Sequence, residues 1–244
     1  MKKAIGIIPA RYGSSRFPGK PLADICGKPM VVRVYERAMQ AQSLDEVLVA
    51  TDDERILDAV KSHGGVAVMT AKSHPNGTNR LVEAAANRDA EFFINIQGDE
   101  PLLDPRMIDQ IVAAMGENPA IPVVTMGKPI RDGLDEPNVV KVVTDLKGFA
   151  LYFSRSVIPY PRHAEFQHCA EHIGIYGYTQ EFLRHFLDLA VGDLEKCESL
   201  EQLRVLENGH KIRVLTWNFP YEGLSVDSEA DLERVRLIFR EEMK

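Results

Sequence analysis

The first half of the chain alternates short apolar runs with segments of helical periodicity. The apolar runs are β-type and of strand length, at 4–10, 46–51, 66–70 and 91–97. Helical patterns follow them, at 30–41, 55–63, 78–87 and 108–115. Strands that alternate with helices pair in parallel, because each helix returns the chain to the same end of the sheet. The pattern predicts an α/β fold whose mainly parallel sheet has helices on both faces.

The alternation stops after Pro122. Short β-type runs follow with few helices between them, at 123–129, 139–144 and 150–154. Helical patterns return near the end of the chain, at 181–189, 200–207 and 228–243, with a late strand at 211–217. A length of 244 residues with 45% hydrophobic residues suits one large α/β domain. We therefore expect a single folding unit, 1–244, with a small antiparallel inserted arm at about 123–217.

The composition restricts the classes of partner. Charged residues make up 27% of the chain and the formal net charge is −7, which argues against binding to nucleic acid or to a membrane surface. The three cysteines form no C-x-x-C pair, which favours free thiols in a reducing compartment. No segment resembles a signal peptide, and the apolar runs are too short to span a membrane. We expect a cytoplasmic protein.

A glycine-rich basic loop follows the first apolar run. It carries Gly13 and Gly19 together with the cations Arg11, Arg16 and Lys20, and a helical pattern comes after it. Strand–loop–helix segments of this kind hold phosphate groups, because backbone N–H groups and the positive end of the helix dipole face the anion. At least three cations within ten residues indicate a polyanionic ligand.

This loop differs from the P-loop pattern G-x-x-x-x-G-K-[ST]. Five residues separate Gly13 from Gly19, and Pro21 stands where the pattern has Ser or Thr. The dinucleotide-binding pattern G-x-G-x-x-G is absent as well. The alternative is an ordinary surface loop. The coincidence of glycine, serine and basic residues between a strand and a helix favours phosphate binding.

Motifs along nearly the whole chain, from about Ile5 to Arg236, resemble those of one enzyme family. The segment IIPARYGSSRFPGKPL resembles the N-terminal signature of sugar-acid cytidylyltransferases. The 3-deoxy-manno-octulosonate (Kdo) branch of that family is matched further by NIQGDEPLL, ALYFSRSVIPYPR, HIGIYGY, SLEQLR and VDSEADLERVR. The resemblance implies a nucleotidyltransferase that uses Mg²⁺ to transfer CMP from CTP to Kdo, with release of pyrophosphate. It also implies a homodimer formed through the arm, and a product used for lipopolysaccharide or capsule.

Polar residues at 11–20, 76–80 and 97–100 each follow a predicted strand, so the parallel sheet should bring them to one cleft. Asp99 is well placed there for Mg²⁺, and the alternative for it is a turn aspartate. The residue pattern alone favours Asp227 as a helix N-cap. The resemblance instead implies that Asp99 and Asp227 form the metal site.

The resemblance also implies the nucleotide contacts. Its phosphate-binding positions are Ala10, Arg11, Gly13 and Lys20, and Gln97, which ends the fourth predicted strand, is a further nucleotide contact. The segment N-G-T-N-R resembles the family's S-G-T-[ED]-R, which cradles the nucleotide and here assigns Asn76, Gly77 and Arg80. Asn76 and Asn79 depart from that pattern, and both remain hydrogen-bonding residues. Arg80 is expected to supply charge or to stack through its guanidinium.

The sugar contacts come mostly from the resemblance. The implied positions are Gln97, Arg155, His172, Tyr178, Glu201 and Gln202. Arg155 could pair with the sugar carboxylate through two hydrogen bonds. Other interpretations stay open for two of these residues: Glu201 could form a surface ion pair with Arg204, and Tyr178 could belong to the core.

The expected reaction is attack of the anomeric hydroxyl of Kdo on the α-phosphorus of CTP, with Arg11, Lys20, Asp99 and Asp227 as the catalytic residues. No serine–histidine–aspartate arrangement is needed. The alternative substrates are 8-amino-Kdo and other sugar acids. A third hypothesis, motivated by Asn76 and Asn79, is a homologue that binds nucleotide without turnover.

Overall fold

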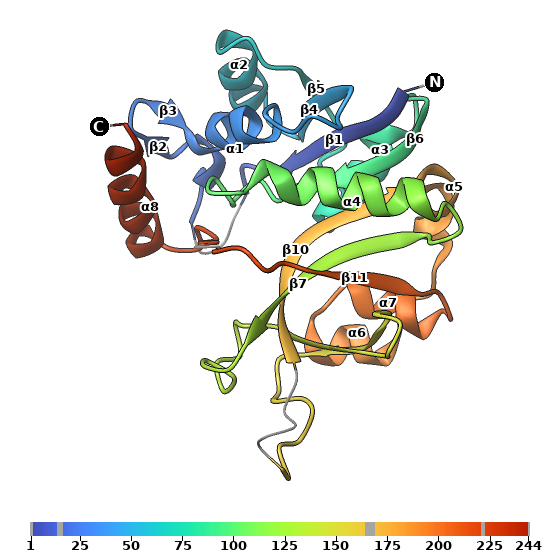
Figure 1. Ribbon diagram of the computed structural model, residues 1–244. Helices are drawn as coiled ribbons and strands as arrows, with labels where there is room; N and C mark the ends of the chain where they lie inside the picture. The colour runs from blue at the N-terminus through green and yellow to red at the C-terminus, as the bar shows by residue number, and fades with distance from the viewer. Residues whose placement is uncertain (1, 14–16, 164–168, 221–222, 244) are drawn as a thin grey trace. The chain divides into compact units, whose positions relative to one another are not determined.

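The computed structural model describes residues 2–13, 17–163, 169–220 and 223–243 (Figure 1). The chain divides into two compact units. The first unit comprises Met1–Val112 and Tyr221–Lys244, and the second comprises Ala113–Pro220. The predicted arm, 123–217, lies within the second unit.

The sheet of the first unit is parallel throughout the strands that the structure describes. The strands are β1 (Lys2–Ala10), β4 (Glu46–Thr51), β5 (Ala67–Met69) and β6 (Ala90–Asn95). They lie side by side in the order β6-β1-β4-β5. In register, Ile7 of β1 lies between Leu48 of β4 and Asn95 of β6. Buried apolar side chains on both faces explain why these segments read as continuous hydrophobic runs.

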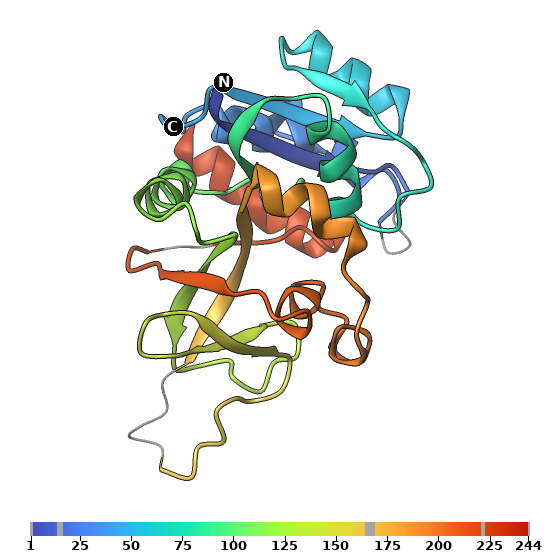
Figure 2. The same ribbon diagram turned by 90° about the vertical axis from the view of Figure 1, so that its right-hand side faces the viewer.

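Helices cover both faces of this sheet, which confirms the predicted fold class. Helices α1 (Met30–Ala38), α2 (Glu54–Ser62) and α3 (Gly77–Ala85) pack on its strands. Two further helices, α4 (Pro105–Glu117) and α8 (Glu229–Glu242), follow later in the chain. The connection from β5 back to β6 reverses direction across the sheet, so α3 lies on the face opposite α1 (Figure 2). None of the described helices is long and apolar enough to cross a membrane.

The segment after the glycine-rich loop differs from the sequence prediction. The loop leads into the 3₁₀ helix η1 (Lys20–Leu22) and then into a hairpin of β2 (Asp24–Ile25) and β3 (Lys28–Pro29). The hairpin turn places Cys26 at φ 51° and Gly27 at φ 84°, the positive values that two-residue β-turns require. The helix predicted at 30–41 is confirmed as α1, Met30–Ala38, but the short 3₁₀ helix and the hairpin that lie between the loop and α1 were not predicted.

The second unit contains the predicted antiparallel strands. Strand β7 (Val123–Ile130) pairs in parallel with β11 (Ile212–Thr216) and antiparallel with β10 (Cys169–Thr179). The antiparallel strands β8 (Lys141–Thr144) and β9 (Ala150–Ser154) extend from β10. Strand β10 was not predicted, because glycines interrupt its alternation and its register shifts between Ile173 and Tyr176. The helical segments are α5 (Gln180–His185), η3 (Phe186–Asp188), α6 (Asp193–Glu198) and α7 (Gln202–Glu207).

A cluster of buried apolar residues packs the last helix, α8, against the rest of the first unit. Its members come from the β2–β3 hairpin, the start of α1 and the α8 region: Ile25, Met30, Val226, Leu232, Val235 and Phe239. The guanidinium groups of Arg33 and Arg37 lie 5.0 and 5.6 Å from the centre of the Phe239 ring. The segment that precedes α8 is thereby held against the first unit.

We predict that Leu232→Ala lowers the free energy of unfolding by about 2–5 kcal/mol, because the side chain is buried and its loss leaves a cavity. Leu237→Ala on the same helix is the matched control, since Leu237 is 56% exposed. Urea unfolding followed by circular dichroism measures both. Equal destabilisation by the two substitutions would contradict the packing described for α8.

Candidate active site

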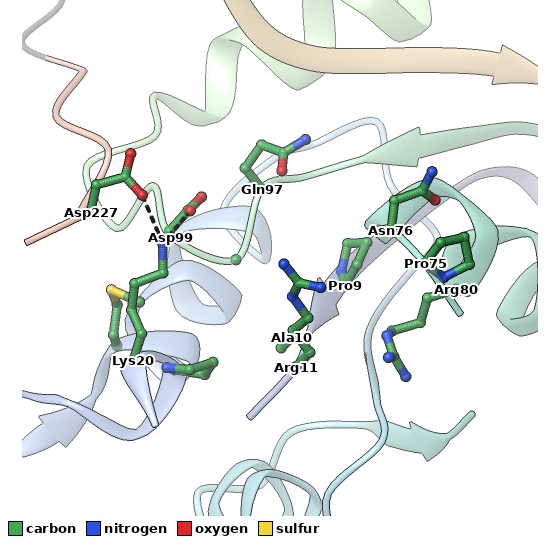
Figure 3. Close-up of a pocket in the computed structure, with 14 residues that line it drawn as sticks. Pro9, Ala10, Arg11, Lys20, Pro75, Asn76, Arg80, Gln97, Asp99 and Asp227 are labelled. Carbon is green, nitrogen blue, oxygen red and sulfur yellow. Dashed lines mark hydrogen bonds and ion pairs between the residues drawn. The ribbon is translucent and has the colours of Figure 1, made fainter. Parts of the chain in front are cut away.

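A pocket of about 310 Å³ lies in the first unit at the carboxyl ends of β1 and β6 (Figure 3). Open parallel sheets bind ligands at this edge. The structure brings together there most of the predicted nucleotide and metal residues: Ala10, Arg11, Lys20, Asn76, Gly77, Arg80, Gln97, Asp99 and Asp227. Gly13 is not among the lining residues, and Ser14, Ser15 and Arg16 of the same loop lie outside the described residues.

A backbone hydrogen bond places Asp99 and Asp227 side by side. The N–H of Val226 donates to the carbonyl oxygen of Asp99 at 2.9 Å, and the Val226 side chain is fully buried. Ser228 caps α8: its Oγ accepts from Asp231 N at 3.3 Å, and Asp231 Oδ2 accepts from Ser228 N at 2.9 Å. The N-cap interpretation of Asp227 is therefore wrong.

Lys20 lies between the two carboxylates. Its Nζ is 2.7 Å from Asp99 Oδ2 and 3.3 Å from Asp227 Oδ1 (Figure 3). The Lys20 side chain is only 14% exposed, whereas those of Asp99 and Asp227 are 27% and 45% exposed. Gly19, at φ 71°, turns the chain into η1, and its N–H donates to Tyr12 O at 3.1 Å to close the loop.

The carboxylate pair fits a magnesium ion. Within the described ranges, no cluster of three or more His, Cys, Asp or Glu side chains is placed to hold a metal. Mg²⁺ does not need such a cluster, because it commonly takes one or two carboxylates and completes its shell with substrate phosphates and water. Asp99 and Asp227 supply hard oxygen donors from adjacent segments, at the edge of a pocket wide enough for a ligand.

The charge of Arg80 is engaged within the protein. The guanidinium, on a residue that is 2% exposed, donates from Nη2 to Asp52 Oδ2 at 2.8 Å and from Nη1 to Thr70 Oγ1 and Ala71 O. Asp52 Oδ1 in turn lies 3.4 Å from the N–H of Tyr12. The buried guanidinium of Arg80 thus joins the ends of β4 and β5 to the start of the glycine-rich loop. In this structure its role is to position these segments.

The loop before α3 is fixed by side chains of that helix. Glu83 accepts from Ala71 N at 2.9 Å and pairs with Nε2 of His74. The hydrogen bond from Ala71 N is the main reason why the pKa of Glu83 lies below its usual value. Asn76 caps α3, because its Oδ1 accepts from Asn79 N at 2.9 Å. Asn76 stands where the family pattern has serine, and it therefore keeps the helix-capping role of that position.

Glycines allow close approach to the end of β1. A Cβ on Gly98 would lie 2.7 Å from the carbonyl oxygen of Pro9, and one on Gly77 would lie 3.4 Å from Pro9 Cβ. Arg11 is exposed and has no ion-pair partner within the part of the chain that the structure describes. The Gln97 side chain enters the pocket from the end of β6 (Figure 3). Arg11 and Gln97 are placed to contact a ligand.

The second unit contains the residues predicted for the sugar. Arg155 donates from Nε to Glu198 O at 2.9 Å and from Nη1 to Pro137 O at 3.0 Å. The Glu198 carboxylate accepts from Ser154 Oγ at 2.6 Å and from Arg155 N at 3.0 Å. The fully buried Lys141 donates from Nζ to the Arg155 carbonyl. Arg155 therefore forms part of an internal clamp in this structure.

His172 and Tyr178 both lie in an aromatic environment on β10. His172 Nε2 is 3.1 Å from Thr125 Oγ1, and its ring packs edge-on against Phe153 at 5.1 Å. Burial lowers the pKa of His172 to about 3, so the imidazole is neutral near pH 7. Tyr178 is 4% exposed and stacks with Phe182 at 6.2 Å. The packing of Tyr178 agrees with the core interpretation.

Glu201 and Gln202 lie at the beginning of α7, and both are partly exposed. Arg204, which the alternative interpretation paired with Glu201, is bound at two points by Glu195, and the negative charge of Glu201 also contributes to the raised pKa of Arg204. Its Nε and Nη2 donate to Glu195 at 2.8 and 2.6 Å. Both Glu201 and Gln202 are partly exposed to solvent. Their contact with the sugar stays a prediction.

Sequence reasoning missed several positioning residues. Asp52 directly follows the predicted strand 46–51, so the strand-end argument applied to Asp99 could have found it. Glu83 stands three residues after Arg80 on α3, a spacing that places both on one helix face. No sequence signal indicates Glu198, because its partners lie far away along the chain.

Comparisons with known proteins agree with this arrangement. The family described as Cytidylyltransferase matches residues 5–212. The 3-deoxy-manno-octulosonate cytidylyltransferase of Syntrophotalea carbinolica is 50% identical over 96% of this chain and 97% of its own length. The Escherichia coli protein of that description is 48% identical over 100% of this chain and 98% of its own length.

A solved structure extends the similarity to the fold. CMP:2-keto-3-deoxy-manno-octonic acid synthetase complexed with CTP matches with a TM-score of 0.94 at 47% identity, covering 98% of this chain and 99% of that one. A 4-diphosphocytidyl-2C-methyl-D-erythritol synthase from Anaerococcus prevotii, at 12% identity and a TM-score of 0.63, shares the fold alone. The chain belongs to the cytidylyltransferase family.

We predict that Asp52→Asn weakens CTP binding about tenfold, or about 1.4 kcal/mol, because Arg80 loses its counter-ion and the loop at Tyr12 is less well fixed. Asp53→Asn is the matched control. It removes the same charge one residue away, where the side chain caps α2 and pairs with Arg55, and asparagine is an equally good cap. Calorimetric titration with CTP measures both, and unchanged affinity in Asp52→Asn would contradict the positioning role.

Proposed function

We propose that this protein transfers CMP from CTP to the anomeric hydroxyl of 3-deoxy-manno-octulosonate (Kdo), giving CMP-Kdo and pyrophosphate. The observation that carries the proposal is the carboxylate pair around Lys20, in the pocket where a parallel sheet binds its ligand. Relatives described as Kdo cytidylyltransferases, 48–50% identical over nearly the whole chain, support the choice of substrates.

The phosphate chain of CTP is expected to lie along the loop that joins β1 to η1. Arg11 is exposed at the end of β1, and Lys20 reaches into the same pocket, so both can offset phosphate charge. Asp99 and Asp227 would hold Mg²⁺. That ion, when bound, neutralises phosphate charge and lowers the pKa of a coordinated hydroxyl group.

The reaction is a displacement at phosphorus. The anomeric oxygen of Kdo forms a bond to the α-phosphorus, and the bond from that phosphorus to the pyrophosphate oxygen breaks. The hydroxyl proton is released, and the electron pair of the broken bond leaves with pyrophosphate. No covalent bond to the protein is needed, because phosphoryl chemistry of this kind depends on positioning and charge stabilisation. Lys20 and Arg11 would supply the charge, and Gln97 lines the same pocket.

We propose a sugar site that uses fewer residues of the second unit than the resemblance implies. Glu201 and Gln202 are the accessible candidates in the second unit, and neutral His172 can act there only as a hydrogen-bonding group. We propose that Arg155 shapes this site through its clamp with Glu198 rather than by binding the sugar carboxylate.

We further propose a homodimer. The second unit exposes apolar side chains on and beyond the β8–β9 hairpin, at Leu146, Leu151 and Tyr160. Sedimentation equilibrium of the purified protein should give twice the mass of the chain, and a monomer at all concentrations would contradict this proposal.

We also propose that the protein is cytoplasmic and that its product is used for lipopolysaccharide or capsule. Cell fractionation and Kdo analysis after depletion of the protein test those two points.

We predict that the protein with CTP, Mg²⁺ and Kdo releases pyrophosphate, and that Asp99→Asn and Asp227→Asn each lower the rate about 10²-fold or more. Glu229→Gln is the control near the site. It removes a charge two residues from Asp227 and disturbs only a surface ion pair, so its rate should stay near that of the parent protein.

The substrates in the same assay separate the alternatives. Pyrophosphate release with 8-amino-Kdo or a sialic acid, but not with Kdo, would support the proposed reaction and assign it to a different sugar acid. Binding of CTP without release for any sugar acid would favour the non-catalytic homologue. Full activity in both aspartate variants would overturn the metal assignment.

A further inference from the structure

The ammonium group of Lys20 occupies the position between Asp99 and Asp227 that a bound cation needs. It lies 2.7 Å from one carboxylate and 3.3 Å from the other, in hydrogen-bonding contact with both (Figure 3). The side chain is mostly enclosed, at 14% exposure. The carboxylate pair thus has a positive counter-ion from the protein itself.

This arrangement is incompatible with a metal ion on the same oxygens. Mg²⁺ binds carboxylate oxygens at about 2.0–2.1 Å and demands near-octahedral geometry. An ion that bridges Asp99 Oδ2 and Asp227 Oδ1 would have to share that space with the Lys20 ammonium, and the two positive charges would repel at short range. The metal therefore needs Lys20 to move.

A nucleotide gives Lys20 another partner. Lys20 lines the pocket and begins η1, directly after the loop expected to hold phosphates. A lysine ammonium is a compact charge with three donors on a flexible stem, so it can exchange one set of anionic oxygens for another. The triphosphate of CTP carries more negative charge than the two carboxylates. Transfer of Lys20 to the phosphates would expose Asp99 and Asp227 at the moment when phosphate oxygens become available as further metal ligands.

We propose that Lys20 is an internal counter-ion that keeps divalent metal off the Asp99–Asp227 pair in the free protein, and that nucleotide phosphates draw it away. Metal then joins the site with the nucleotide rather than before it. This inference rests on the proposed function for the identity of the metal site, and it adds an order of binding. Lys20 acts first on the carboxylates and then on the phosphates.

The test is a titration of the nucleotide-free protein with Mn²⁺, in which electron paramagnetic resonance measures the free ion. We expect the parent protein to bind Mn²⁺ weakly, and Lys20→Met to bind it at least about tenfold more tightly, because the competing charge is gone. Lys20→Arg keeps the charge and should bind as weakly as the parent. Lys20→Met combined with Asp99→Asn should lose the tight site.

Equal Mn²⁺ affinity in the parent and Lys20→Met would overturn the proposal, as would tight binding that persists after Asp99→Asn is added. Circular dichroism and the unfolding midpoint establish that each variant is folded, and Lys20→Gln serves as a second neutral variant. The readout needs no turnover. Pyrophosphate release by the parent protein tests the proposed function separately, so either idea can fail without the other.

Discussion

The hydrogen bond from Val226 N to Asp99 O is the contact on which the active site depends. It joins the segment before the last helix to the loop that follows β6, two parts of the chain that are far apart in sequence. Burial of Val226 among Ile25, Met30 and the apolar face of α8 fixes this contact in place. Because Asp227 is the next residue, the packing of a terminal helix determines where the second carboxylate of the proposed metal site lies.

Two cationic side chains at the pocket, those of Lys20 and Arg80, are paired with carboxylates of the protein itself. Lys20 satisfies the Asp99–Asp227 pair, and the buried Arg80 satisfies Asp52 while it holds the end of β5. Buried charges must be paired because an isolated one is costly to desolvate. The pairs differ in what they can do next. Both residues line the pocket, but Arg80 is almost fully enclosed and positions its neighbours, whereas the more exposed Lys20 can exchange its partners.

Periodicity and strand-end reasoning predicted the architecture and a large part of the pocket. The alternation of runs gave the parallel sheet, and the rule that ligands bind beyond strand ends selected Lys20, Asn76 and Asp99 together. The proposed metal role of Asp227 needed the family resemblance, because sequence alone cannot show that Ser228 takes the capping position. The partner of Arg80 was not predicted, since a side-chain contact between segments appears only in three dimensions. Strand β10 escaped detection because glycines and a register shift interrupt its pattern.

The most direct measurement is a crystal structure of the protein with CTP and Mn²⁺, with anomalous diffraction recorded to locate the ion. The account predicts an anomalous peak in contact with both Asp99 and Asp227, and Lys20 Nζ on a phosphate oxygen instead of between the carboxylates. A metal ion held only by the nucleotide and away from these aspartates would contradict the account. So would a Lys20 that still bridges the two carboxylates while the triphosphate and the metal are bound.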